Sequence, residues 1–108
     1  MINYKSKIYV AGHKGLVGSA ITKNLKLQGY KNILYSDKSS LDLTNQKKVF
    51  DFLKKKKPDF IFIAAAKVGG IYSNSKFRGE FIYSNLSIQN NIINGAYECG
   101  IKDLIFLG

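Results

Sequence analysis

The chain has 108 residues, of which 45% are apolar, so the sequence predicts one small globular domain and excludes a disordered tail. No apolar run approaches the roughly 18 residues that cross a membrane. The N-terminus does not resemble a signal peptide, so we expect a cytoplasmic protein with no membrane partner. Lysine and arginine number 17 against 7 acidic residues, but only Arg78 is an arginine, which nucleic-acid and phosphate sites favour. We therefore expect a solvated basic surface and no nucleic-acid partner.

Short apolar runs alternate with helical patterns along the whole chain. Gly29 and Gly100 stand where helices end, and Pro58 disfavours helix at the residue before it. The third apolar run shows no alternation, as expected of a parallel strand that is covered on both faces. The expected elements, in order, are a strand at 7–11, a helix at 15–28, a strand at 33–35, a helix at 45–56, a strand at 60–66, a helix at 79–99 and a strand at 104–107.

Strands that alternate with helices predict an α/β fold with a parallel sheet and right-handed crossovers. The expected architecture of residues 1–108 is a partial NAD(P)-binding domain. It is the N-terminal half of a doubly wound Rossmann-type sheet in the strand order 3-2-1-4, truncated before its second half and a substrate domain. In that order the ligand crevice lies at the carboxyl ends of strands one and four, where the winding reverses.

A glycine-rich loop follows the first expected strand, with the spacing G-x-x-G-x-x-G. Gly12 lets the chain leave the strand in a tight turn, Gly15 lets the backbone approach a pyrophosphate, and Gly18 lets the helix pack closely. The helix N-terminus, at Leu16 and Val17, presents free N–H groups to the phosphates. The loop therefore predicts dinucleotide binding, and a purely structural turn is the alternative.

The residues around this loop bear on which dinucleotide is bound. His13 and Lys14 occupy its variable positions, and Lys14 is predicted to reach the 2′-phosphate of NADP, unless the two form a solvent-facing pair. At the end of the second strand, Asp37 suits the ribose hydroxyls of NAD, whereas Lys38 suits the extra phosphate of NADP. The two lysines favour NADP, and NAD stays possible. One histidine without ligand partners predicts no metal site.

Two further segments are candidates for the adenine side of the site. Asp42 and Leu43 can place a carboxylate beside the adenine amino group and an apolar side chain against the ring. The alternative is that Asp42 or Thr44 caps the second helix. The third strand ends in small residues, including Ala65, on which a ligand can lie, although alanine is also ordinary core filler.

Four segments, at residues 10–21, 64–71, 81–86 and 104–108, carry a resemblance that covers the whole chain. Among them, the Ala-Ala-Ala-Lys-Val-Gly-Gly run is far more specific than the glycine loop. Together the segments resemble the GDP-L-fucose synthases, which belong to the extended short-chain dehydrogenase/reductase family.

The resemblance implies an NADPH-dependent enzyme that epimerises GDP-4-keto-6-deoxy-D-mannose and then reduces its 4-keto group. It implies that residues 12–18 bind the pyrophosphate, and that Lys14 and Lys38 stand where the family often has arginines on the 2′-phosphate. The family's catalytic Ser, its Tyr-x-x-x-Lys pair and its GDP-sugar-binding domain follow the region that corresponds to this chain. The partners it implies for the full-length enzyme are a GDP-sugar substrate and a second copy of the chain.

Other interpretations remain open from the residues. Asp37 is the best support for another nucleotide-sugar epimerase or dehydratase that uses NAD, and a non-enzymatic dinucleotide- or nucleic-acid-binding module is a third possibility. Tyr72 and Lys76 have the Tyr-x-x-x-Lys spacing, but they follow the third strand instead of lying on the expected helix, so we assign them no catalytic role. Cys99, near a helix end between apolar neighbours, is expected to be a small packed residue.

Overall fold

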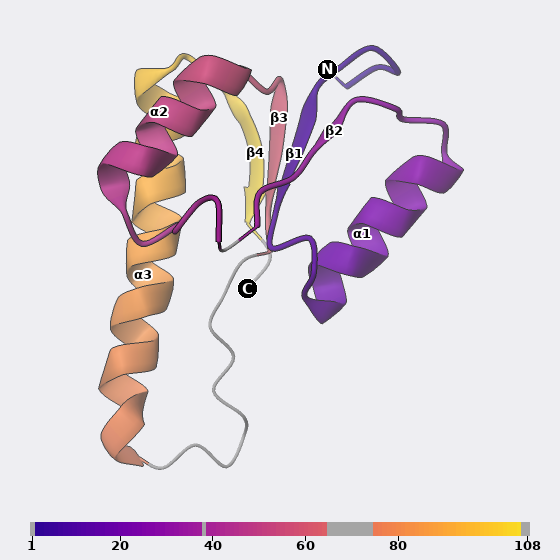
Figure 1. Ribbon diagram of the computed structural model, residues 1–108. Coiled ribbons are helices and arrows are strands. Elements are labelled where there is room, and N and C mark those ends of the chain that lie inside the picture. The colour runs from indigo at the N-terminus through magenta and orange to yellow at the C-terminus, as the bar shows by residue number, and fades with distance from the viewer. Residues whose placement is uncertain (1, 38, 65–74, 107–108) are drawn as a thin grey trace.

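The computed structural model describes residues 2–37, 39–64 and 75–106, with side chains left out at 75–82 and 84, and Figure 1 shows the arrangement. Every predicted strand and helix is present there. The predicted boundaries hold to within about four residues, the largest difference being the earlier start of the last helix. The elements are β1 (Ile8–Ala11), α1 (Leu16–Leu27), β2 (Ile33–Leu34), α2 (Gln46–Lys56), β3 (Phe60–Ile63), α3 (Ser75–Glu98) and β4 (Asp103–Phe106).

The strands form one parallel sheet, as predicted, but the predicted order 3-2-1-4 is wrong. The observed order is β2-β1-β3-β4. β1 pairs with β3 over four residues and with β2 over only two. β2 has only two residues, both half-buried, so it provides few backbone hydrogen bonds and little apolar surface for a further strand, and it lies at the edge. The longer apolar β3 takes the central place. The winding therefore reverses between β1 and β3.

Helices cover both faces of the sheet: α1 lies on one side, and α2 and α3 lie on the other (Figure 1). Side chains of a strand alternate between faces, so β1 is shared between two cores although all four of its residues are buried. Ile8 and Val10 pack toward α1 with Leu25. Tyr9 and Ala11 pack toward the other helices, in a core that also contains Val49, Leu53, Ile61, Ile63, Ile88, Ile92 and Ala96.

The helix ends follow the local sequence in most places. Gly29 ends α1 with a φ of 98°, as predicted, and Lys57 ends α2 with a φ of 48°, immediately before Pro58. The expectation that Asp42 or Thr44 caps α2 is wrong. The cap is Asn45, whose Oδ1 accepts a hydrogen bond of 3.0 Å from the backbone N–H of Lys48, because the helix begins only at residue 46.

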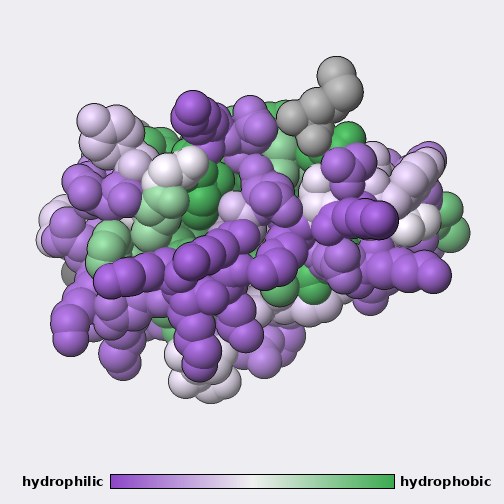
Figure 2. Space-filling view, turned by 90° about the horizontal axis from the view of Figure 1, so that it is seen from above, coloured by the Kyte–Doolittle hydropathy of each residue, from purple (hydrophilic) through white to green (hydrophobic). Residues whose placement is uncertain are grey.

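Lysines gather at the edge of the sheet where the strands begin. Figure 2 looks onto this edge and shows a mainly hydrophilic surface. Residues that directly precede parallel strands meet at one edge, which explains the grouping. The exposed lysines that precede the strands are Lys5, Lys7, Lys31, Lys57 and Lys102, and the last turn of α2 adds Lys54, Lys55 and Lys56. Among the described helices, none is both long enough and apolar enough to cross a membrane.

Candidate functional site

A cleft of about 740 Å³ opens at the carboxyl ends of β1, β2 and β3. Its walls are the glycine loop at residues 12–15, the end of β2 at 36–37 and the segment 41–44, with Ala64 after β3 and Ile88 of α3. This is the point at which the winding reverses, where doubly wound sheets bind their ligands. The crevice predicted between strands one and four lies instead between β1 and β3, because the strand order differs.

The cleft brings together most of the predicted site residues. Leu16, Val17 and Gly18 are not part of its lining and form the first turn of α1, directly after the glycine-loop residues that line it. Lys38 and Ala65 lie outside the described residues, as do Tyr72 and the strand residues predicted beyond Ala64. Of the residues predicted to bind the cofactor, those that line the cleft are Gly12, His13, Lys14, Gly15, Asp42 and Leu43.

Each of the three glycines in the loop has a different structural role. Gly12 turns with a φ of 87°, and its carbonyl accepts a hydrogen bond of 3.0 Å from the N–H of Gly15. A Cβ on Gly18 would lie 1.9 Å from that same carbonyl oxygen, so only glycine fits there. A Cβ on Gly15 would meet only ordinary contact at 3.4 Å. The fold therefore tolerates a side chain at Gly15, and its absence leaves room for a ligand.

The first turn of α1 is available to an anion. The helix begins after Gly15, which makes no side-chain cap, and there is no acidic residue in the first turn. An α-helix leaves its first N–H groups without intrahelical acceptors, and its dipole adds partial positive charge at this end. The backbone at Leu16 and Val17 thus supplies donors and positive potential beside the glycine loop, which suits phosphate groups.

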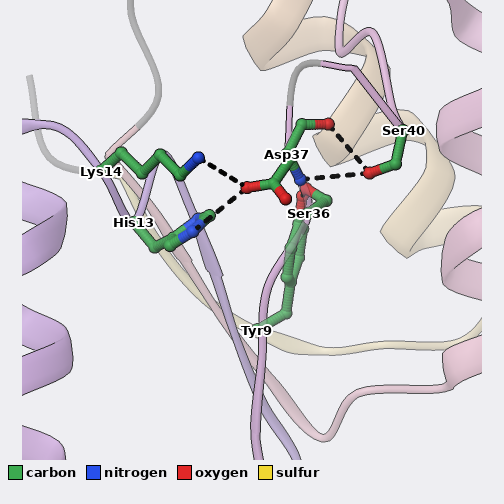
Figure 3. A network of polar contacts seen from close by, with 6 residues as sticks. All are labelled: Tyr9, His13, Lys14, Ser36, Asp37 and Ser40. Atoms are coloured by element: carbon green, nitrogen blue, oxygen red, sulfur yellow. Dashed lines mark hydrogen bonds and ion pairs between the residues drawn. The ribbon is translucent and has the colours of Figure 1, made fainter.

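A cluster of polar side chains, Lys14, His13 and Asp37, joins the loop to the end of β2 (Figure 3). Lys14 Nζ lies 3.1 Å and His13 Nε2 lies 3.6 Å from Oδ1 of Asp37. The side chains of Lys14 and Asp37 are 76% and 52% exposed, so solvent screens this ion pair. The His13 side chain is only 17% exposed, and its ring lies 4.8 Å from the ring of Tyr35. The solvent-facing alternative therefore describes Lys14 but not His13.

Tyr9 and Ser36 fix the backbone beneath this cluster. Tyr9 is fully buried in β1, and its hydroxyl lies 2.6 Å from Ser36 Oγ. Burial raises the pKa of Tyr9 to about 12, against a smaller lowering by the Ser36 hydrogen bond. Sequence reasoning missed this pair. The available signal was a tyrosine within an otherwise aliphatic strand, because a buried tyrosine hydroxyl needs a hydrogen-bond partner.

The far side of the cleft is mainly apolar. Leu41 is 6% exposed, and Leu43 packs against the core while its carbonyl accepts a hydrogen bond of 3.0 Å from the side chain of Asn91 on α3. Asp42 Oδ1 accepts hydrogen bonds from the N–H and the hydroxyl of Thr44, at 2.9 and 2.6 Å. An apolar wall beside a carboxylate and a set of phosphate donors matches the parts of an adenine nucleotide.

The described residues contain no group of three histidine, cysteine or acidic side chains that could hold a metal ion. Cys99 is half-buried and packs against the core, as predicted. The described residues of the cleft thus offer groups suited to binding: backbone donors for anions, the exposed ammonium of Lys14, the carboxylates of Asp37 and Asp42, and an apolar wall.

Comparisons with known proteins agree with this geometry. The NAD dependent epimerase/dehydratase family matches residues 8–108. GDP-L-fucose synthase 1 of Arabidopsis thaliana is 49% identical over 108 residues, which cover 100% of this chain and 33% of the relative. GDP-L-fucose synthase of Sinorhizobium fredii is 46% identical over 102 residues, which cover 94% of this chain and 32% of the relative. The chain thus spans about a third of the length of the curated relatives it matches.

Among solved structures, MlghC, a GDP-mannoheptose C4 reductase from Campylobacter jejuni with NADP bound, superimposes with a TM-score of 0.94. It is 41% identical, and the match covers 100% of this chain and 34% of that chain. An identity of this size over the whole chain supports a similar fold for the sheet, the helices and the glycine loop.

Proposed function

The chain belongs to the NAD dependent epimerase/dehydratase family, and from this we propose that it is the NADP(H)-binding part of an enzyme that epimerises and reduces a GDP-linked keto sugar, as GDP-L-fucose synthases do. The observation that carries the proposal is the glycine loop that opens into the cleft at the reversal of winding. The names of its relatives, which are GDP-L-fucose synthases and a GDP-sugar reductase with NADP bound, supply the substrate class.

The residues present fit a dinucleotide. The open side of Gly15 gives the pyrophosphate room, and the first turn of α1 gives it N–H donors. Lys14 is the cation for the 2′-phosphate, with His13 packed behind it on Tyr35. Asp42 and Leu43 take the adenine, and Lys38 and Ala65 complete the proposed contacts. When bound, the cofactor supplies a hydride to the keto sugar.

The role of residues 1–108 in this reaction is to bind and orient the cofactor, and we assign no catalytic residue to them. The Ser, Tyr and Lys that the resemblance implies for proton transfer follow the region of the family that corresponds to residues 1–108. Asp37 is the specific observation that favours a second candidate, a nucleotide-sugar epimerase or dehydratase that uses NAD, because a carboxylate at the end of β2 suits the ribose hydroxyls.

We further propose a cytoplasmic homodimer built on α3. Four exposed apolar side chains recur on this helix at steps of three, seven and four residues, which places them on one face. They are Tyr83, Leu86, Ile93 and Tyr97, with exposures of 74%, 50%, 42% and 79%. In size-exclusion chromatography with light scattering, we expect the native protein to elute as a dimer and a Leu86→Glu variant to elute as a monomer.

Titration of the native protein that carries this chain with NADPH and NADH, followed by fluorescence, tests the main proposal. We expect NADPH to bind more tightly. Gly15→Ala is expected to weaken NADPH binding by about tenfold or more, about 1.4 kcal/mol, because a Cβ there obstructs the pyrophosphate but meets no close contact in the fold.

The matched control for Gly15→Ala is Ser19→Ala, at an exposed position one turn further along α1. This variant should bind NADPH as the native protein does. Tighter binding of NADH than of NADPH would favour the NAD-using alternative. Binding of neither nucleotide would refute both enzymatic proposals.

A further inference from the structure

The segment at residues 41–44 forms one side of the cleft and is anchored to a helix far along the chain. It runs between the end of β2 and the start of α2 and passes beside α3 (Figure 1). All four of its residues line the cleft, together with Ile88 of α3. In the proposed function this segment takes the adenine, so a contact that fixes the segment also fixes the adenine site.

Local hydrogen bonds shape the segment as a turn. The N–H of Leu41 donates to the carbonyl of Asp37 at 2.8 Å, and the N–H of Asn45 donates to the carbonyl of Asp42 at 3.0 Å. The N–H of Thr44 donates to Asp42 Oδ1 at 2.9 Å. Each of these bonds joins residues at most four positions apart, so a movement of the turn as a unit would leave all three intact. They give the turn its shape but do not set its place against α3.

Asn91 of α3 supplies a directional contact between this turn and a distant part of the fold. Its side-chain amide N–H donates to the carbonyl of Leu43 at 3.0 Å, across 48 positions of sequence. Leu41 and Leu43 also pack against the core, but apolar packing has no direction, whereas a hydrogen bond orients the peptide that accepts it. The bond from Asn91 therefore determines which way the side chains beside that peptide face.

The helix holds Asn91 firmly in place. Its neighbours Ile88 and Ile92 are 6% and 0% exposed, and α3 packs so closely on α2 that a Cβ on Gly95 would lie 2.9 Å from Leu53 Cδ1. Asparagine is a poor helix former, because its side chain competes for backbone groups, and here it bonds a backbone group outside the helix. The turn is thus the part that would move if this donor were lost.

We propose that Asn91 is a positioning residue for the adenine of the bound dinucleotide and acts through the Leu43 carbonyl. Asn91 itself is not part of the cleft lining. Dispersion contacts with a flat ring need close approach, since a gap of about 0.5–1 Å forfeits roughly a quarter to a half of the attraction. A small shift of the turn is therefore enough to weaken adenine binding. This inference rests on the proposed cofactor-binding function and adds to it a residue from α3.

The test measures dissociation constants of NADPH, 2′,5′-ADP and inorganic pyrophosphate for the native protein that carries this chain and for two variants. Asn91→Leu removes the donor at similar volume, and Asn91→Asp turns a carboxylate oxygen toward the Leu43 carbonyl. We expect both variants to bind NADPH and 2′,5′-ADP about fivefold more weakly, as for the loss of one hydrogen bond. Pyrophosphate affinity, which depends on the glycine loop and the first turn of α1, should stay unchanged.

Asn24→Asp is the matched control, since it makes the same chemical change at an exposed position of α1 outside the cleft lining. It should bind all three probes as the native protein does. Asn91→Gln keeps an amide donor and is expected to lose less affinity than Asn91→Leu.

Two results would overturn the inference while the binding function stands. In the first, Asn91→Leu binds 2′,5′-ADP as the native protein does. In the second, this variant weakens 2′,5′-ADP and pyrophosphate by the same factor, which would mean that Asn91 supports the fold in general and not the adenine site. If the native protein binds neither NADPH nor NADH, the proposed function itself is overturned.

Discussion

The cleft and the core beneath α2 and α3 differ in how far their side chains are exposed to solvent, although β1 contributes to both. In the cleft the polar side chains are partly or largely exposed, and the ion pair between Lys14 and Asp37 is screened by solvent. In the core Leu53 and Ile92 are fully buried, and α3 approaches α2 so closely that a Cβ on Gly95 would lie 2.9 Å from Leu53 Cδ1.

The difference separates stability from binding. Removing an exposed ion pair costs at most about 1 kcal/mol, whereas truncating a fully buried aliphatic side chain costs about 2–5 kcal/mol. Substitutions in the cleft should therefore change affinity with little effect on folding, and substitutions in the core should do the reverse. Gly18 packs against the Gly12 carbonyl of the cleft loop, and the buried Tyr9 contacts Ser36 of the cleft wall, so substitutions at these two positions are expected to break this rule.

Leu53→Ala should have the largest effect on stability. The side chain is fully buried between the sheet and α3, so its loss should lower the free energy of unfolding by about 2–5 kcal/mol. Urea denaturation measures this change. The control is Leu27→Ala on α1, where the side chain is 76% exposed and the free energy of unfolding should change by less than about 0.5 kcal/mol. NADPH affinity of the folded fraction should stay unchanged, and a selective loss of affinity would contradict the separation.

Gly18→Ala should reduce both stability and binding. The new Cβ would lie 1.9 Å from the Gly12 carbonyl oxygen, and relief of that clash requires the loop or α1 to move, at a cost of about 1–3 kcal/mol. The displaced loop should also bind NADPH poorly. Gly15→Ala is the comparison, because that variant should lose NADPH affinity but keep its stability. Equal melting temperatures for the two variants would argue against the close contact at Gly18.

Tyr9→Phe should have the smallest effect on stability at neutral pH. Loss of the hydrogen bond to Ser36 should lower the free energy of unfolding by about 1 kcal/mol. The effect depends on pH. The folded-state pKa of Tyr9 is about 12, above the ordinary value near 10, so the unfolded chain loses its proton first as the pH rises. The stability of the native protein is thus complete below pH 10 and declines toward pH 12, by up to about 2.7 kcal/mol.

Unfolding of the native protein and of Tyr9→Phe at pH 8 and at pH 11 checks this prediction. The advantage of the native protein should shrink or reverse at the higher pH, because phenylalanine has no proton to lose. Tyr4→Phe, at a 63% exposed tyrosine, provides the control. A difference between Tyr9→Phe and the native protein that is the same at both pH values would contradict a buried, neutral Tyr9.

Much of the local structure could be predicted from the sequence, because it depends on residues close together in the chain. The three-to-four-residue spacing of apolar residues determined that α1 and α2 are helices, and Gly29 and Pro58 marked where they end. The glycine spacing directly after an apolar strand determined the loop, and with it the main candidate site. These features follow from backbone geometry and from the covalent spacing of side chains.

The order of the strands and the partners of the site residues were decided only by the tertiary structure. No local sequence pattern predicts that β3 pairs with β1 on the side opposite β2, because that pairing depends on which strand buries more surface there. The convergence of Lys14 and His13 on Asp37, and of Tyr9 on Ser36, likewise joins residues more than 20 positions apart. Such contacts exist only once the whole sheet has closed, so a sequence window cannot contain them.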